Sequence, residues 1–206
     1  KPGKLDIAGD VAGAIQWMKG VKAGNIGVAG NIAVIGGGNT AMDAARAAKR
    51  VKGVQHAYIV YRRNARYMPA DEEELRLALE DGVEFKELLA PVSLENGELL
   101  CKKCILGEPD ASGRRSPVET DETVSVPCTA LISAIGEKVD GKLYAEIGIT
   151  LTERGKAIVN PDTLETAVPG VYVIGDANRG PATVVEAIAD ARKAADAIVG
   201  KYGYSI

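Results

Sequence analysis

NIAVIGGGNTA, residues 31–41, is the stretch of sequence that decides the fold. Its first five residues form a short apolar run, which is typical of a strand buried on both faces. The glycines indicate a turn, the alanine-rich residues 40–51 predict a helix, and residues 56–61 (HAYIVY) predict a second strand. Strand, tight turn, helix and strand together predict a βαβ unit, and therefore a parallel sheet with a right-handed crossover.

The glycine turn matches the pattern Gly36-x-Gly38-x-x-Ala41, a fingerprint of dinucleotide-binding proteins. The first glycine makes the turn, the second lets a pyrophosphate approach the backbone, and the small third residue lets helix and strand pack closely. The free N–H groups from Asn39 to Ala41 would then face the phosphates at the positive end of the helix. A tight turn without a ligand is the alternative, which the flanking strand and helix disfavour.

The end of the second strand selects the nucleotide. An acid near this position bonds the ribose 2′-hydroxyl in NAD enzymes, whereas an arginine accommodates the 2′-phosphate in NADP enzymes. Here Arg62 and Arg63 follow the strand directly, Arg66 is close behind, and the first acid is Asp71. Guanidinium groups match a phosphate dianion in geometry and charge, so the sequence predicts NADP(H). A solvated basic turn is the alternative.

Hydrophobic spacing and turn signals predict the remaining elements. Asp71 and Glu74 are spaced like a capping box at the start of a helix that Gly82 closes. Asn96-Gly97 predicts a hairpin between two antiparallel strands, since both residues tolerate a positive φ. The other predicted elements are a helix over 10–22, a loop over 108–117, strands over 127–135, 148–151, 157–159 and 170–174, and a helix over 182–199.

Composition argues against several classes of protein. The net charge of −3 gives no reason to expect a nucleic acid or an anionic membrane as a partner. No apolar run approaches the roughly 20 residues that span a bilayer, and the start shows no signal peptide. Three cysteines cannot all pair, which disfavours a disulfide framework and favours the cytoplasm.

Cys101-x-x-Cys104 suggests redox chemistry, but its context favours a structural role. The pair lies in a predicted strand, where residues three apart point to opposite faces, whereas a redox pair usually begins a helix. Cys128 precedes an apolar strand and is interpreted as core packing. His56, the single histidine, has no partner pattern for catalysis or metal binding, and Trp17 is interpreted as a packing anchor. No metal site is predicted.

Five strings of the sequence resemble one family of flavoproteins. They are IAVIGGGNTAMDAAR, YIVYRRNARYMPA, ILGEPDASGRRSPV, ALISAIG and VYVIGDANRGPATVVEAIADARKAA, which together extend over nearly the whole chain. They are similar to the small subunit of glutamate synthase and to its relatives, which include the flavin and NADPH modules of dihydropyrimidine dehydrogenase and of large iron–sulfur oxidoreductases described as selenate reductases. The resemblance implies that the turn holds the NADPH pyrophosphate and that the basic segment holds its 2′-phosphate. The residues concerned are Gly36, Gly38, Asn39, Thr40, Arg62, Arg63 and Arg66.

The same resemblance implies part of an FAD site. Gly175-Asp176 is similar to the second flavin-binding motif of the family, in which the aspartate bonds the ribityl or phosphate region of FAD. The next helix would point its N-terminus, at Ala182 and Thr183, to the flavin. A turn before a helix without a ligand is the alternative. The family's main FAD fingerprint and its iron–sulfur cysteines are absent from this sequence, so we expect a fragment that is inactive alone. The implied partners are an N-terminal FAD-binding half and an iron–sulfur domain or subunit.

Together these observations predict an α/β fold in two parts. Residues 31–135 are expected to form a Rossmann-like dinucleotide-binding domain with a small antiparallel β layer, and residues 1–30 and 136–206 parts of an incomplete FAD-binding domain. The implied function is hydride transfer from NADPH to FAD, with electrons passed onward. The cofactors carry that chemistry, so no catalytic side chain is predicted. The alternatives are a stand-alone NADP(H)-binding or sensor module without redox turnover, a vestigial interaction subunit, and a thioredoxin-reductase-like enzyme.

Overall fold

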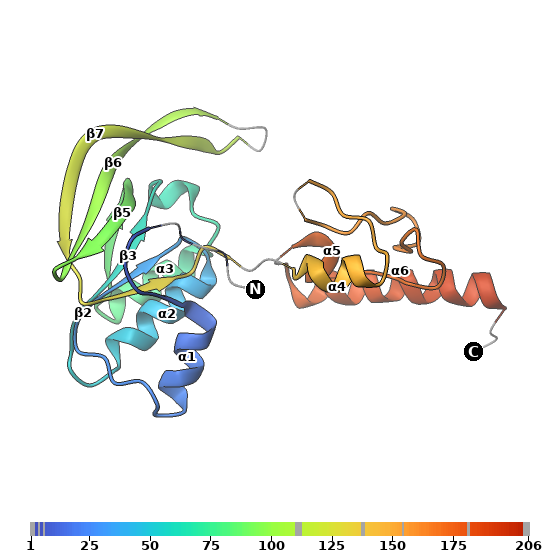
Figure 1. Ribbon diagram of the computed structural model, residues 1–206, viewed down its shortest axis with the longest axis horizontal. Coiled ribbons are helices and arrows are strands. Elements are labelled where there is room, and N and C mark those ends of the chain that lie inside the picture. The colour runs from blue at the N-terminus through green and yellow to red at the C-terminus, as the bar shows by residue number, and fades with distance from the viewer. Residues whose placement is uncertain are drawn as a thin grey trace. The chain divides into compact units, whose positions relative to one another are not determined.

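The computed structural model describes residues 3, 5, 7–109, 113–136, 139–153, 155–180 and 182–203 (Figure 1). By their internal contacts these residues form two compact units, one within residues 2–136 and the other within residues 137–206. The segment that precedes Asn31 packs within the first unit. The assignment of residues 1–30 and 136–206 to one FAD-binding domain stays a prediction.

A five-stranded parallel sheet forms the centre of the first unit. Its strands lie in the order β1-β8-β2-β3-β4, and each neighbouring pair is parallel. The predicted βαβ unit is confirmed as β2, α2 and β3. The strands are β1 (Val11–Gly13), β2 (Gly30–Ile35), β3 (Val54–Tyr61), β4 (Glu84–Glu87) and β8 (Ala130–Ser133). The helices are α1 (Ala14–Lys22), α2 (Asn39–Lys49), α3 (Glu72–Glu80) and the short 3-10 helix η1 (Ala65–Tyr67).

Side chains of the central strands alternate between two cores. Ile32 and Val34 of β2 pack with α1, α2 and α3, whereas Ala33 and Ile35 pack with an antiparallel sheet. That sheet has the order β5-β6-β7 and consists of β5 (Leu89–Glu95), β6 (Glu98–Pro109) and β7 (Arg115–Pro127). Figure 1 shows the helices on one face of the parallel sheet and the antiparallel strands on the other. Both faces of β2 are covered, which explains why its four buried residues, 32–35, are all apolar.

The antiparallel sheet confirms the predicted hairpin and corrects one predicted loop. Asn96 and Gly97 join β5 to β6 with positive φ angles of 51° and 78°. The loop predicted over residues 108–117 is wrong at both ends, because β6 continues to Pro109 and β7 begins at Arg115; residues 110–112 lie outside the described part of the chain. The strand ends that were missed carry exposed residues such as Glu108, Pro109 and Arg115, and such ends show little apolar alternation to predict them from.

The second unit is built mainly from helices. It contains α4 (Gly141–Glu146), α5 (Asp176–Arg179) and α6 (Val184–Tyr202). Isolated bridges, such as those from Val159 to Thr166 and from Glu165 to Tyr172, occur where strands were predicted over 148–151, 157–159 and 170–174. Those strand predictions are wrong, because an apolar run becomes a strand only beside partner strands, and the described residues of this unit pair singly. The buried core residues are Tyr144, Ile149, Ala157 and Val173.

Candidate functional site

Three glycines connect β2 to α2 at the carboxyl edge of the parallel sheet, and only two of them are explained by protein contacts. Gly36 has a φ of 151°, and a Cβ there would lie 2.4 Å from the carbonyl oxygen of Ala134. A Cβ on Gly37 would lie 2.5 Å from the Tyr61 ring. A Cβ on Gly38 would meet a single proline carbon, at 3.9 Å. The space beside Gly38 is therefore open to a ligand that approaches the backbone, as the fingerprint requires.

The N-terminus of α2 adjoins this open space. Gly38 is the N-cap, and its carbonyl accepts the N–H of Ala41 at 2.8 Å. Within the described part of the chain, the N–H groups of Asn39 and Thr40 donate to no protein acceptor, and both residues are exposed. The first turn of α2 contains no acid. Free N–H groups at the positive end of a helix favour a bound anion such as a phosphate.

The side chain of Asn39 is already engaged in the protein. Its Nδ2 donates to the Asp71 carboxylate at 3.0 Å, and the Asp71 N–H donates back to its Oδ1 at 3.0 Å. This exchange corrects the predicted capping box of Asp71 and Glu74, since Asp71 makes no side-chain cap for α3 and bonds Asn39 instead. A phosphate role for Asn39 therefore depends on its backbone N–H.

The three predicted arginines lie on one loop after β3, but they are not equivalent. Arg62 and Arg66 are exposed, and the guanidinium of Arg66 lies 5.9 Å from the centre of the Tyr67 ring. Arg63 is half-buried, and its Nε donates at 2.8 Å to the carbonyl of Arg115, which lies in the second hairpin, that of β6 and β7. Two arginines are thus free to face a phosphate, while the third contacts the hairpin.

The structure brings the arginine loop and the glycine turn together. They follow the neighbouring strands β2 and β3, whose carboxyl ends lie at the same edge of the sheet. The Tyr61 ring packs on Gly37, and the N–H of Ala70 donates to the carbonyl of Gly37 at 3.0 Å. Ligands of open parallel sheets bind at this edge.

Two further residues at this edge were not predicted by the sequence analysis. Ser133 ends β8 beside Ile35, and its buried hydroxyl has no partner among the residues that the structure describes. Arg114 reaches from the hairpin, and its Nη2 donates to the Tyr61 hydroxyl at 3.2 Å and to the Tyr67 carbonyl at 3.1 Å. A polar residue that ends an apolar strand was the available signal for Ser133, whereas nothing local marks Arg114.

The predicted flavin residues of the second unit also lie together. Asp176 begins α5, and its carboxylate accepts the N–H of Ala182 at 3.2 Å. Thr183 is the N-cap of α6 and forms a capping box with Glu186. Gly175 has a φ of 60°, which makes the sharp turn before Asp176. The turn and the start of α6 are therefore held in one arrangement by the chain itself.

An ion pair between exposed Arg179 and buried Asp190, which the sequence analysis did not predict, supports this turn. Asp190 of α6 is 1% exposed and accepts hydrogen bonds from Nε of Arg179 and from the N–H of Gly175, the latter at 3.0 Å. The hydrogen bond from Arg179 holds the pKa of the Asp190 carboxyl below its ordinary value. An acid in the middle of an alanine-rich helix gave no sequence signal, because surface acids are common there.

The cysteines are buried packing residues. Cys101 and Cys104 both face the interior, at 0% and 4% exposed, so the prediction of opposite faces is wrong. A register shift between Lys102 and Cys104 breaks the strand alternation and turns both thiols inward. Burial raises the pKa of the Cys101 thiol to about 12 and also raises the pKa of Cys104 and of Cys128. All three are free, and protonated buried thiols are poor nucleophiles.

Metal-binding clusters and membrane-spanning helices are both absent from the described parts of the chain. No group of three or more His, Cys, Asp or Glu side chains is placed to hold a metal ion there. Among the same residues, no helix combines the length and the apolar character needed to cross a membrane.

A doubly covered parallel sheet with an open glycine turn at its carboxyl edge defines a dinucleotide-binding protein of the Rossmann type. The family model of pyridine nucleotide-disulphide oxidoreductases matches residues 2–191, and the chain belongs to this family. It is 43% identical over 202 residues to YgfK of Escherichia coli O157:H7, an oxidoreductase by name, across 96% of this chain and 20% of that protein. It is 36% identical over 179 residues to the small chain of NADPH glutamate synthase of Escherichia coli K12, across 82% of this chain and 38% of that one.

The fold is also that of a solved structure. FprA of Mycobacterium tuberculosis, in complex with NADPH, superposes with a TM-score of 0.79 at 19% identity, across 98% of this chain and 61% of that one. These findings confirm the predicted fold class and the resemblance to the glutamate synthase small subunit, and they support NADP(H) and FAD as the cofactors of this family. The chain spans about a fifth of the length of the curated relatives that it first matches.

Proposed function

We propose that this chain is the NADPH-binding part of a flavin-dependent oxidoreductase. The observation that carries the proposal is the open glycine turn beside a loop with two exposed arginines, at one edge of the sheet. The chemistry that NADPH would supply in this site is a hydride for the flavin. The residues of this chain bind and orient the nucleotide, and none of them is needed as an acid or base.

Each part of the nucleotide site has a distinct role in this proposal. The space beside Gly38 and the free N–H groups of Asn39 and Thr40 would hold the pyrophosphate. Arg62 and Arg66 would hold the 2′-phosphate, because their side chains are exposed. Arg63 supports the loop instead, since its Nε is bonded to the hairpin.

The second unit is proposed to contribute the distal part of an FAD site. Gly175, Asp176, Ala182 and Thr183 would meet the flavin at the N-terminus of α6. The apolar side chains at the start of this helix, Val184 and Val185, are 77% and 75% exposed. We propose an N-terminal FAD-binding half as the partner that covers them, and an iron–sulfur domain or subunit that receives the electrons in the cytoplasm. The greater length of the relatives supports this arrangement.

Calorimetric titration of the chain with NADPH and with NADH tests the nucleotide site. Arg62→Ala should weaken NADPH binding about ten- to a hundredfold and leave NADH binding nearly unchanged, because the lost hydrogen bonds go to a charged group. Arg63→Ala should have a smaller effect, since its Nε is already bonded within the protein.

Arg50→Ala is the matched control, because it removes the same charge from the opposite end of α2, where Arg50 pairs with Asp81. Equal losses of NADPH and NADH affinity in Arg62→Ala would refute the assignment of the 2′-phosphate. The chain alone should also emerge colourless after incubation with FAD and desalting, and a stoichiometric flavin spectrum would contradict the proposed division of the FAD site.

A further inference from the structure

The loop that carries the three arginines is closed on itself by a tyrosine. Tyr61, the last residue of β3, donates its hydroxyl proton to the carbonyl of Tyr67 at 2.9 Å, six residues later. The Tyr61 ring also packs on Gly37 of the glycine turn. This one side chain therefore contacts both halves of the candidate nucleotide site.

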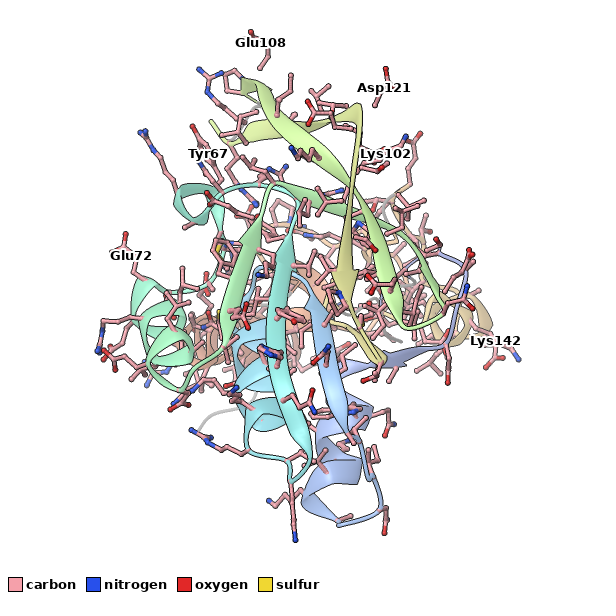
Figure 2. All side chains as sticks on the ribbon, turned by 90° about the vertical axis from the view of Figure 1, so that its left-hand side faces the viewer. Tyr67, Glu72, Lys102, Glu108, Asp121 and Lys142 are labelled. Carbon is pink, nitrogen blue, oxygen red and sulfur yellow. The ribbon has the colours of Figure 1, made fainter. Side chains whose placement is uncertain are left out.

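Arg114 joins this closed loop to the antiparallel hairpin. Its Nη2 donates to the Tyr61 hydroxyl at 3.2 Å and to the Tyr67 carbonyl at 3.1 Å, and the bonded groups are partly buried. The next residue, Arg115, accepts the Nε–H of Arg63 on its carbonyl at 2.8 Å. In Figure 2, the labelled Tyr67 lies in the upper left of the view, below Glu108, which is near the end of β6. Two consecutive hairpin residues thus hold both the start and the end of the loop.

These contacts matter because the loop presents flexible, exposed arginines. Ordering a loop and its long side chains on binding costs free energy, which is saved when the loop is held in its bound conformation beforehand. A hydrogen bond from a guanidinium is stronger than one between neutral groups, so Arg114 is well suited to hold the loop. The 2′-phosphate distinguishes NADPH from NADH, and only NADPH would gain from such ordering of Arg62 and Arg66.

We propose that Arg114 is a positioning residue for the 2′-phosphate loop, so that a hairpin residue 47 positions beyond Tyr67 sets the preference for NADPH over NADH. This inference rests on the proposed nucleotide site. It assigns the small antiparallel sheet a part in nucleotide selectivity, in addition to its packing against β2 and β3.

Titration of the chain with NADPH and NADH, in four variants, tests the proposal. Arg114→Gln should weaken NADPH binding about two- to tenfold, the range for one net hydrogen bond, and leave NADH binding unchanged. Tyr61→Phe keeps the ring on Gly37 but removes the bridging hydroxyl, so it should act in the same direction. Arg114→Lys keeps a charged donor and should recover part of the NADPH affinity.

Arg115→Gln is the matched control. It removes the same charge one residue away, but its side chain bonds the carbonyl of Gly107 within the hairpin, and its own carbonyl stays available to Arg63. NADPH affinity should therefore equal that of the unmodified chain. Thermal unfolding of every variant, followed by circular dichroism, shows that the folded chain is being compared.

Three results would overturn the inference. Equal NADPH losses in Arg114→Gln and Arg115→Gln would indicate a general charge effect. A parallel loss of NADH affinity in Arg114→Gln would indicate a structural role alone. A loss in Arg114→Gln with none in Tyr61→Phe would indicate that Arg114 contacts the nucleotide directly. Failure of the proposed function is distinguishable, because the unmodified chain would then show no preference for NADPH.

Discussion

The two units of this chain differ in how much of their apolar surface they bury for themselves. In the first unit, Ile32 and Ile59 are completely buried between the parallel sheet and its helices. In the second unit, Val184 and Val185 at the start of α6 are largely exposed. A sheet covered on both faces completes its own core, whereas a long helix against a few isolated bridges does not. The first unit accordingly presents a candidate site formed by its own residues, and the second presents only a turn and a helix end.

Gly36→Ala should have the largest effect on the free energy of unfolding. It tests whether the first unit is stabilised by its own packing. Its φ is 151°, and an added methyl carbon would lie 2.4 Å from the Ala134 carbonyl oxygen, so unfolding should become easier by about 3 kcal/mol or more. Gly38→Ala is the contrast, since a Cβ there meets nothing closer than 3.9 Å. It should change stability by less than about 0.5 kcal/mol yet weaken NADPH binding at least about tenfold.

Urea unfolding and calorimetry together separate these two glycines. Normal NADPH binding by a folded Gly38→Ala variant would show that the open space beside Gly38 is not the pyrophosphate site. A stable Gly36→Ala variant would show that the turn adapts more readily than its geometry indicates.

Asp190→Asn should cause the next largest loss of stability, and this loss should be confined to the second unit. It leaves Arg179 without its carboxylate partner and weakens the bond to the Gly175 N–H. The Arg179 side chain is 42% exposed, so water compensates in part and we expect a loss of about 1–3 kcal/mol. Asp196→Asn, on an exposed position of the same helix, is the control. Urea unfolding, followed by the loss of helical circular dichroism, measures the stability of both variants.

The same ion pair predicts a pH dependence. The pKa of Asp190 is lower in the folded chain than in the unfolded chain, where an aspartate titrates near about 3.9. Its contribution is therefore fully present above about pH 4 and is lost as the pH falls through the folded pKa. The difference in stability between Asp190→Asn and the unmodified chain should therefore shrink as the pH is lowered below about 4, and a constant difference would contradict the assignment.

The double variant Cys101→Ala and Cys104→Ala should have a modest effect on the first unit. Loss of two buried thiols should reduce its stability by about 1–2 kcal/mol and leave NADPH binding unchanged, because both side chains pack within the core. In the unmodified chain the thiols should react with a chromogenic disulfide only after unfolding, since the pKa of Cys101 is about 12. Rapid reaction of the folded chain at pH 8 would show that the pair is accessible and redox-active.

Val185→Ser should have the smallest effect and makes the comparison of the two units sharper. The side chain is 75% exposed in this chain, so its replacement should change stability by less than about 0.5 kcal/mol. Ala194→Ser, which places a hydroxyl at a position of the same helix that is 5% exposed, should cost about 1–2 kcal/mol. Equal losses of stability for Val185→Ser and Ala194→Ser in urea unfolding would mean that Val185 is covered within the chain.

Local patterns predicted most of the elements that position the nucleotide site. The run before Gly36, the alanine-rich helix after it and the Asn96-Gly97 hairpin all lie where the sequence placed them, because each depends on neighbours within a few residues. The inward turn of both Cys101 and Cys104 was not predictable, since it depends on a register shift between two strands. The pair of hydrogen bonds between Asn39 and Asp71 was not predictable either, because it joins residues 32 positions apart.

The sequence by itself determined the class of fold and the two turns that carry the candidate sites, and it predicted the class of nucleotide. It did so because glycine, arginine and apolar side chains act through local geometry and charge, which short stretches of sequence carry with them. Only the tertiary structure decided which of the clustered arginines remain exposed, that Arg114 bonds the arginine loop, and that Asp190 bonds the turn at Gly175. Those roles arise from hydrogen bonds between residues distant in sequence, and the partners are chosen by the packing of whole elements.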